Sequence, residues 1–127
     1  SMNTSILLQE FIEEANGEDL RIVVVGNKIV ASMKRTSEQD DFRSNVHRGA
    51  KTQKVQLTPR EKFIALSATK HLGLGVAGVD LIRSNIGPLL IEVNASPGLK
   101  GIEEVTGVNV AKCIVQYVEK DVKRTRK

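Results

Sequence analysis

Two adjacent residues, Gly26 and Asn27, constrain the fold of this chain more than any other local feature. They separate residues 20–25 from residues 28–33, and both of these runs are rich in valine, isoleucine and other strand-favouring residues. A Gly-Asn pair readily adopts the positive φ angles that a tight two-residue turn requires. The sequence therefore predicts an antiparallel hairpin over this part of the chain.

The predicted hairpin carries polar side chains at its open end. With a two-residue turn, Asp19 faces Lys34 and Arg21 faces Ser32, and all four lie on one side of the sheet. Two interpretations remain open for this group. It is either an ordinary cross-strand ion pair or part of a phosphate or ribose site.

A second hairpin is expected over residues 76–94, with residues 85–87 as a three-residue loop. Counting back from this loop places Asp80 directly opposite Glu92, and strand periodicity places Asn94 on the same face. The other face of the hairpin is apolar, so a shift by one residue would bury the acids. Burial therefore fixes the predicted register.

The predicted pairing of Asp80 with Glu92 requires a positive partner, because like charges opposite each other destabilise a sheet. Two carboxylates and the amide oxygen of Asn94 form a hard donor set that suits Mg²⁺ or Mn²⁺. The alternative is a solvated sheet edge with mobile lysines. The abrupt end of the strand at residues 94–98, Asn-Ala-Ser-Pro-Gly, favours the metal site, since functional residues often lie where strands end.

Helices are expected after each hairpin. Thr58 and Glu61 form a capping-box pattern with Pro59 at the first helical position, and the helix is expected to end at about His71. A final helix is expected at residues 109–122, where apolar residues recur with a period near 3.6.

The remaining segments complete the expected architecture. Residues 6–12 are expected to form a strand, and the polar residues 35–56 a long loop. Hairpins followed by helices, without regular βαβ alternation, indicate an α+β domain in which helices pack on one face of an antiparallel sheet.

Length and composition fit a single domain. The chain has 127 residues, of which 40% are hydrophobic, which is enough for a modest core. Ser1 and Met2 are interpreted as a cloning scar, residues 3–122 as one lobe of a longer protein, and residues 123–127 as a basic tail.

The composition also bears on partners and compartment. The net charge is +4, but aromatic residues for base stacking make up only 3%, which argues against nucleic-acid binding. No apolar run approaches the roughly 18 residues of a membrane span. The single Cys113 has no disulfide partner within the chain, so a reducing, cytoplasmic location is expected.

Residues 41–49 supply a candidate anion-binding loop, Asp-Phe-Arg-Ser-Asn-Val-His-Arg-Gly. Its two arginines make charge-assisted hydrogen bonds to phosphates or carboxylates, and its glycine lets the backbone approach closely. A basic loop without a ligand is the alternative that composition leaves open.

Five segments, in this order and spacing, resemble the ATP-grasp superfamily and its RimK branch in particular. They read Leu-Gln-Glu-Phe-Ile at 8–12, Asp-Leu-Arg at 19–21, the loop at 41–49, Gly-Val-Asp at 78–80, and Glu-Val-Asn-Ala-Ser-Pro-Gly at 92–98. The fold implied is the C-terminal lobe of the ATP-grasp domain. The sequence departs from the expected loop at Ala50, where a second glycine is expected.

The resemblance implies a role for each matching residue. The metal ligands implied are Asp80, Glu92 and Asn94, the same three that the hairpin register brings together. Arg21 matches a basic position near the transferred phosphate and, with Arg43, is an expected catalytic residue. The nucleotide-binding residues implied are Glu10 and Phe11 at the adenine, Asp19, and, at the phosphates or the acyl intermediate, Arg43, Ser44 and Asn45.

The activity implied by the resemblance is ligation of a carboxylate to an amine through an acylphosphate, with ATP and Mg²⁺ or Mn²⁺ as cofactors and two metal ions in the site. For the RimK type, free glutamate is joined to the C-terminus of a small-subunit ribosomal protein. Since the first lobe is missing from the pattern, the fragment alone is expected to be inactive. A homo-oligomer is a further expectation, because removing the first lobe would expose apolar surface.

Two other readings remain at this point. One is an ATP-grasp ligase that acts on a cofactor or an amino-acid carrier protein, which these motifs do not distinguish from the RimK type. The other is a basic module that binds ribosomal RNA without catalysis, which would bind with a steep dependence on salt.

Overall fold

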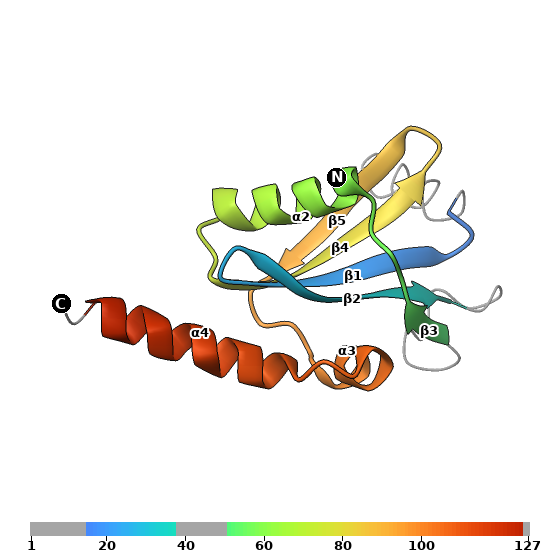
Figure 1. Ribbon diagram of the computed structural model, residues 1–127. Coiled ribbons are helices and arrows are strands. Elements are labelled where there is room, and N and C mark those ends of the chain that lie inside the picture. Colours follow the sequence, from blue (N-terminus) through green and yellow to red (C-terminus); the bar gives the residue numbers. More distant parts are fainter. Residues whose placement is uncertain (1–14, 38–50, 126–127) are drawn as a thin grey trace.

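The computed structural model describes residues 15–37 and 51–125, which form an antiparallel five-stranded sheet with three helices (Figure 1). The strand order is β3-β2-β1-β4-β5. The strands are β1 (Glu18–Val25), β2 (Lys28–Thr36), β3 (Lys51–Lys54), β4 (Val76–Ser84) and β5 (Gly87–Asn94), and the helices are α2 (Pro59–His71), α3 (Lys100–Thr106) and α4 (Val110–Thr125). The strand expected at residues 6–12 lies outside the described residues.

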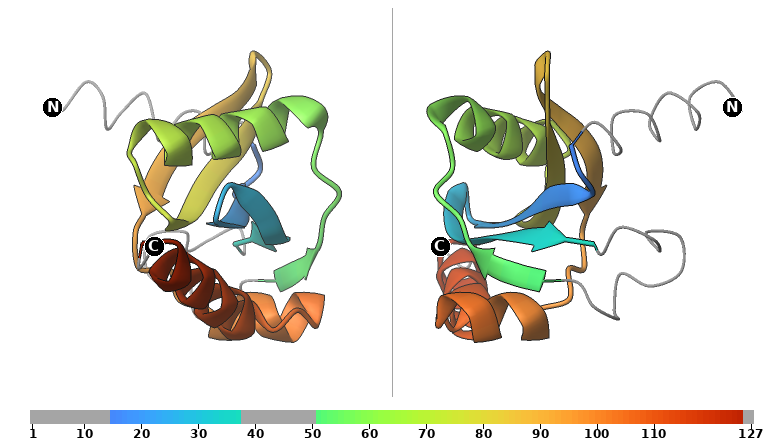
Figure 2. Two further views of the ribbon diagram at one scale, coloured as in Figure 1. Left: turned by 60° about the vertical axis from the view of Figure 1, so that its left-hand side comes forward. Right: turned by 90° about the vertical axis from the view of Figure 1, so that its right-hand side faces the viewer.

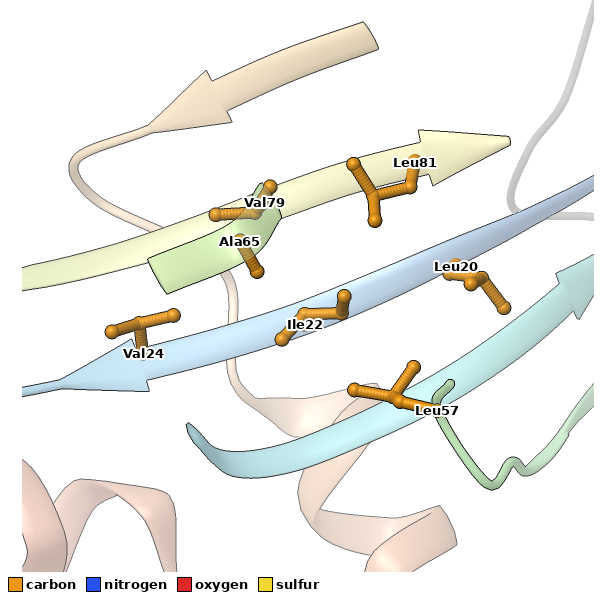
Figure 3. Packing of buried hydrophobic residues seen from close by; sticks show 7 residues of the cluster. All are labelled: Leu20, Ile22, Val24, Leu57, Ala65, Val79 and Leu81. Carbon is orange, nitrogen blue, oxygen red and sulfur yellow. The ribbon is translucent and has the colours of Figure 1, made fainter. Parts of the chain in front are cut away.

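Helices cover both faces of the sheet, so the α+β antiparallel class is confirmed but the expected packing on one face is wrong (Figures 1 and 2). On one face, Ala65 of α2 packs with alternate residues of β1 and β4 (Figure 3). On the other, Ile102 of α3 and Val110 of α4 pack against Val23 and Val25. The central strand β1 is buried on both sides, which explains its unbroken apolar run.

The first hairpin forms as predicted at its turn but not at its open end. Val25 pairs with Lys28, and a β-bulge between Val23 and Val24 then leaves Val30 as an extra residue in β2. The remaining register moves by one residue, so the expected partners of β1 are wrong. Asp19 is opposite Arg35 instead of Lys34, and Arg21 is opposite Met33 instead of Ser32.

The second hairpin reaches its predicted register by a different route. Its turn has two residues instead of the expected three, because Ser84 pairs with Gly87. A bulge between Asp80 and Leu81 then adds one residue to β5. The two differences cancel, and the predicted pairing of Asp80 with Glu92 is confirmed.

Helix α2 begins with the predicted capping box. The Thr58 hydroxyl accepts from the Glu61 amide at 3.1 Å, and the Glu61 carboxylate accepts from the Thr58 amide at 2.9 Å. Glu61 is buried and also accepts two hydrogen bonds from Arg83 of β4. The expected end of the helix at His71 is confirmed.

Two further elements differ from expectation. Strand β3 lies within the expected loop over residues 35–56, and β2 itself extends to Thr36. All four side chains of β3 are exposed, so it is held by backbone pairing and has no apolar pattern to reveal it. Helix α3 was not expected; it is short, is anchored by buried Ile102, and ends at Gly107 in the left-handed conformation.

Helix α4 ends three residues later than expected, at Thr125 instead of Val122, so part of the expected basic tail is helical. Tyr117 lies against Gly26 at the hairpin turn and against Gly75 before β4. The C-terminal part of the helix extends past the sheet (Figure 1), and its residues Val118 and Val122 are exposed. In the described part of the chain, no helix is long and apolar enough to cross a membrane.

Candidate functional site

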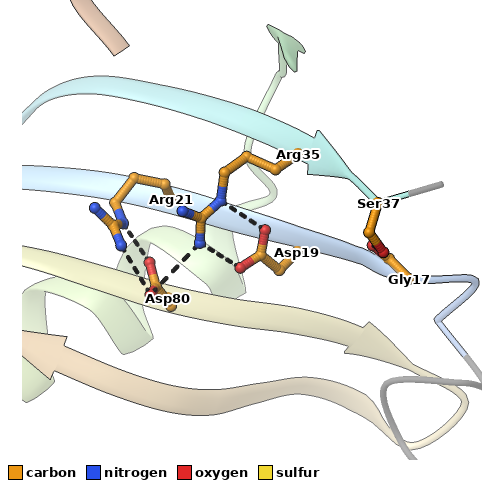
Figure 4. A network of polar contacts seen from close by, with 6 residues as sticks. All are labelled: Gly17, Asp19, Arg21, Arg35, Ser37 and Asp80. Carbon is orange, nitrogen blue, oxygen red and sulfur yellow. Dashed lines mark hydrogen bonds and ion pairs between the residues drawn. The ribbon is translucent and has the colours of Figure 1, made fainter. Parts of the chain in front are cut away.

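A network of charged side chains lies on the α3 and α4 side of the sheet, at the open end of the β1–β2 hairpin (Figure 4). Arg21 of β1 is opposite Asp80 of β4 and donates two hydrogen bonds to its carboxylate, from Nε to Oδ1 and from Nη2 to Oδ2 at 3.1 Å. Both side chains are largely buried, so this bidentate pair is well screened from water.

A second arginine completes the network. Arg35 of β2 donates from Nε to Asp19 Oδ1 at 2.9 Å and from Nη2 to Asp19 Oδ2. The same Nη2 lies 3.6 Å from Asp80 Oδ2. Burial alone would lower the pKa of Arg35, but the hydrogen bonds and charge of Asp19, with the charges of Asp80 and Glu92, outweigh it and raise the pKa.

The positive partner that Asp80 requires is therefore present within the chain. The sequence was interpreted to require a divalent ion as this positive partner. The structure corrects that interpretation, because Arg21 on the neighbouring strand is already bound to Asp80. The side chain of Asp80 is 8% exposed, whereas Glu92 on edge strand β5 is exposed. Arg21 and Arg35 neutralise the buried acid, and Glu92 faces solvent.

Asn94 ends β5 next to this network. Its Oδ1 accepts a hydrogen bond from the Ser96 amide at 2.9 Å, which turns the chain away from the sheet. Gly78, opposite Asn94, lets this turn approach closely, since a Cβ there would lie 2.7 Å from Cβ of Pro97. The strand end predicted to be functional is thus tightly packed against β4.

The donor set fits a divalent metal in part. Asp80 and Glu92 are directly opposite on adjacent strands, and Asn94 is two residues beyond Glu92 on the same strand. Two carboxylates and one amide oxygen are suitable ligands for Mg²⁺. Within residues 15–37 and 51–125, no three His, Cys, Asp or Glu side chains are grouped closely enough to hold a metal by themselves. Any metal here would need further oxygens, as a nucleotide or water supplies.

An open cavity of about 590 Å³ lies beside the network. The sheet contributes Arg21, Arg35 and Asn94 to its wall, and α3 contributes Lys100 and Glu104. The wall carries three cations against one acid, and Lys100 is the cation that is not paired with Asp19 or Asp80, so the cavity favours an anionic ligand near Lys100. Arg35 and Lys100 were missed in the sequence, because a bulge moves Arg35 onto this face and α3 was not expected.

The structure brings together five of the predicted site residues: Asp19, Arg21, Asp80, Glu92 and Asn94. The others lie outside the described residues, namely Glu10, Phe11, Arg43, Ser44 and Asn45. Lys34, which was expected on the polar face, instead lies on the α2 side of the sheet and pairs with Glu18 at 3.1 Å.

Comparison with known proteins gives a match to the family described as the RimK-like ATP-grasp domain, over residues 1–118. A Legionella pneumophila (strain Corby) protein named "Probable alpha-L-glutamate ligase" is 56% identical over 122 residues, which are 96% of this chain and 40% of the relative. A Picosynechococcus sp. protein of the same name is 57% identical over 120 residues, 94% of this chain and 40% of the relative. The chain thus spans 40% of the length of these relatives.

Solved structures share the fold. A D-alanine–D-alanine ligase from Bacillus anthracis complexed with ATP has a TM-score of 0.64 at 18% identity, covering 86% of this chain and 41% of that one. The ATP-grasp ligase PsnB, complexed with a phosphomimetic precursor variant, Mg and ADP, has a TM-score of 0.60 at 22% identity, covering 80% and 32%. At these identities the similarity establishes the fold alone.

Proposed function

Because this chain belongs to the RimK-like ATP-grasp family, we propose that the protein is an ATP-dependent carboxylate–amine ligase that adds glutamate to the C-terminus of a small-subunit ribosomal protein. The name of the relatives, probable alpha-L-glutamate ligase, supports the choice of amine. The observation that carries the proposal is the placement of Asp80 opposite Glu92, beside a cavity whose wall contains Arg21 and Asn94.

The proposed reaction has two steps. An oxygen of the acceptor carboxylate attacks the γ-phosphorus of ATP, and the bond to the ADP oxygen breaks, which gives an acylphosphate and ADP. The amino group of glutamate then attacks the acyl carbon. Phosphate leaves with the bonding electron pair, and the proton of the amine passes to solvent.

The described residues would serve this reaction mainly by binding and orientation. Arg21 would bind the transferred phosphoryl group in the cavity, where its guanidinium offsets the charge that develops. Asp19 would hold the nucleotide. Outside the described residues, we propose that Glu10 and Phe11 meet the adenine, and that the phosphates or the acyl intermediate are bound by Arg43, Ser44 and Asn45.

Asp80, Glu92 and Asn94 would hold Mg²⁺, or Mn²⁺ in its place, with two ions in the complete site. When bound, the metal neutralises phosphate charge and aligns the phosphoryl group with the attacking oxygen. The PsnB complex contains Mg and ADP, which supports the choice of Mg²⁺ as the metal. Arg21 would compete with the metal for Asp80, because its guanidinium donates to both oxygens of the carboxylate.

The proposal is tested with the complete protein, since the chain spans only 40% of its relatives. ATP, Mg²⁺, glutamate and a peptide with the C-terminal sequence of a small-subunit ribosomal protein are incubated together. The expected result is ADP release that depends on the peptide, with a mass gain of one glutamyl residue per addition. A matched peptide with an amidated C-terminus should give neither. ADP release without any glutamylated product would contradict the proposed substrate, and we expect no turnover from the 127-residue chain alone.

A further inference from the structure

Arg35 occupies a position between two of the proposed functional residues. Its guanidinium holds the carboxylate of Asp19 through two hydrogen bonds, and its Nη2 is 3.6 Å from Asp80 (Figure 4). These three residues come from three adjacent strands, β2, β1 and β4. A single side chain therefore connects the proposed nucleotide residue with the proposed metal residue.

The β-bulge at Val30 is what brings Arg35 to this place. Without it Lys34 would face Asp19, as simple alternation predicts. A lysine ammonium is a point charge, whereas a guanidinium can donate to one carboxylate in a bidentate manner and still present Nη2 to a second. Bulges are common next to functional sites, where they change the direction of a side chain. Here the bulge puts the guanidinium of Arg35 on the same face of the sheet as Asp19 and Asp80.

The surroundings of Arg35 fit a role in binding. It lines the cavity together with Arg21 and Lys100, and its side chain is 18% exposed. Its charge lowers the attraction of Asp80 for any other cation, and its hydrogen bonds fix the orientation of the Asp19 carboxylate. One residue thus opposes metal binding in the absence of nucleotide and prepares the nucleotide site.

We propose that Arg35 is a positioning residue that couples nucleotide binding at Asp19 to divalent-metal binding at Asp80. The proposal rests on the proposed function, in which both ligands bind at this site. By linkage, the factor by which metal strengthens nucleotide binding equals the factor by which nucleotide strengthens metal binding. Removing Arg35 makes metal binding tighter in the absence of nucleotide and leaves the Asp19 carboxylate less well oriented. Bound nucleotide then strengthens metal binding by a smaller factor.

The test measures the affinity of the complete protein for a fluorescent ADP analogue, with saturating Mg²⁺ and without Mg²⁺. The ratio of the two dissociation constants is the coupling factor. Arg35→Gln is expected to reduce this factor about tenfold, a size within the usual range of such couplings. Arg35→Lys, which keeps the charge and loses the fork of donors, is expected to reduce it less.

Lys34→Gln is the matched control, because Lys34 is the next residue on β2 and lies on the opposite face. It should leave the coupling factor unchanged. If Arg35→Gln lowers the melting temperature but not the coupling factor, Arg35 is merely structural and the proposal is overturned. If that variant fails to fold, an unchanged factor in Arg35→Lys overturns it. Absence of any Mg²⁺ effect on ADP binding in the wild-type protein would instead overturn the proposed function itself.

Discussion

The guanidinium of Arg21 lies along the carboxylate of Asp80, with Nε bonded to Oδ1 and Nη2 3.1 Å from Oδ2. This pair puts a cation of the protein against the acid proposed to bind a metal ion. Removing one partner of a largely buried ion pair destabilises the protein, because the remaining charge is then poorly solvated. Arg21 therefore acts as the counter-ion of Asp80 until another cation replaces it.

Replacing Arg21 with glutamine should make divalent-ion binding tighter in the absence of nucleotide. The acids Asp80 and Glu92 then lose the nearest positive charge, and like charges on opposite residues favour a shared cation. We expect the dissociation constant for Mn²⁺, measured by electron paramagnetic resonance, to fall several-fold relative to the wild-type protein. The additional variant Asp80→Asn should reverse this gain. An unchanged or weaker affinity in Arg21→Gln would show that the arginine does not compete with a metal.

The pairing of Asp80 with Glu92 could be predicted from the sequence because burial restricts register. The apolar face of β4 and β5 allows only pairings that keep Asp80 and Glu92 on the other side, so an incorrect loop length did not change the outcome. The same reasoning failed for β2. There a bulge exchanged Lys34 for Arg35, and no residue type in the sequence marks a bulge at Val30.

Helix α2 could be predicted from the sequence and helix α3 could not, because only α2 is marked by local signals. Helix α2 carries its own start signals in Thr58 and Glu61, which bond to each other's backbone. Helix α3 has only seven residues and no side-chain cap, and it is held by packing of Ile102 against the sheet. Contacts of this kind are tertiary, and a short sequence window does not contain them.

Acid should destabilise the protein partly through Glu61. Burial alone would raise the pKa of Glu61, but hydrogen bonds from Arg83 and Thr58 and the charge of Arg83 outweigh it and lower the pKa below its ordinary value of 4.5. A carboxyl whose pKa is depressed by folding contributes its stability above the unfolded pKa and loses it as pH falls through the folded pKa. The urea concentration at the unfolding midpoint should therefore decrease as the pH is lowered below about 5.

The variant Glu61→Gln identifies the source of this pH dependence. It should be less stable than the wild-type protein at neutral pH, and the difference should narrow as the pH is lowered. Asp121→Asn is a suitable control, because the carboxylate of Asp121 forms an exposed i,i+3 ion pair with Arg124 on α4. If the difference in stability between Glu61→Gln and the wild-type protein stayed constant from neutral pH to about pH 3, Glu61 would not be a source of the pH dependence.

Gly75→Ala should loosen the packing of α4 on the sheet. A Cβ at this position would lie 2.5 Å from Oη and 2.9 Å from Cζ of Tyr117, so the ring must move. We expect a loss of about 1–3 kcal/mol in the free energy of unfolding, typical of overpacking. In a Tyr117→Ala background the same change should cost almost nothing, and a cost that persists there would exclude the clash. Gly101→Ala, in α3 with open space around it, should be neutral or stabilising.

Gly78→Ala should disturb the candidate site without changing any proposed ligand. Its Cβ would lie 2.7 Å from Cβ of Pro97 and 3.6 Å from Cδ of Arg21, so the turn after Asn94 must shift away from β4. Since a site displaced by a fraction of an ångström binds poorly, the Mg²⁺-dependent affinity of the complete protein for ADP should fall about tenfold.

Gly75→Ala separates this effect from a general loss of stability, because its Cβ would meet Tyr117 of α4 and not the turn after Asn94. At a temperature where both variants remain folded, Gly75→Ala should keep the wild-type affinity for ADP with Mg²⁺, and only Gly78→Ala should lose it. Equal affinities in the two variants would mean that the turn after β5 does not position Asn94 for binding. The close approach of Pro97 to Gly78 would then serve packing alone.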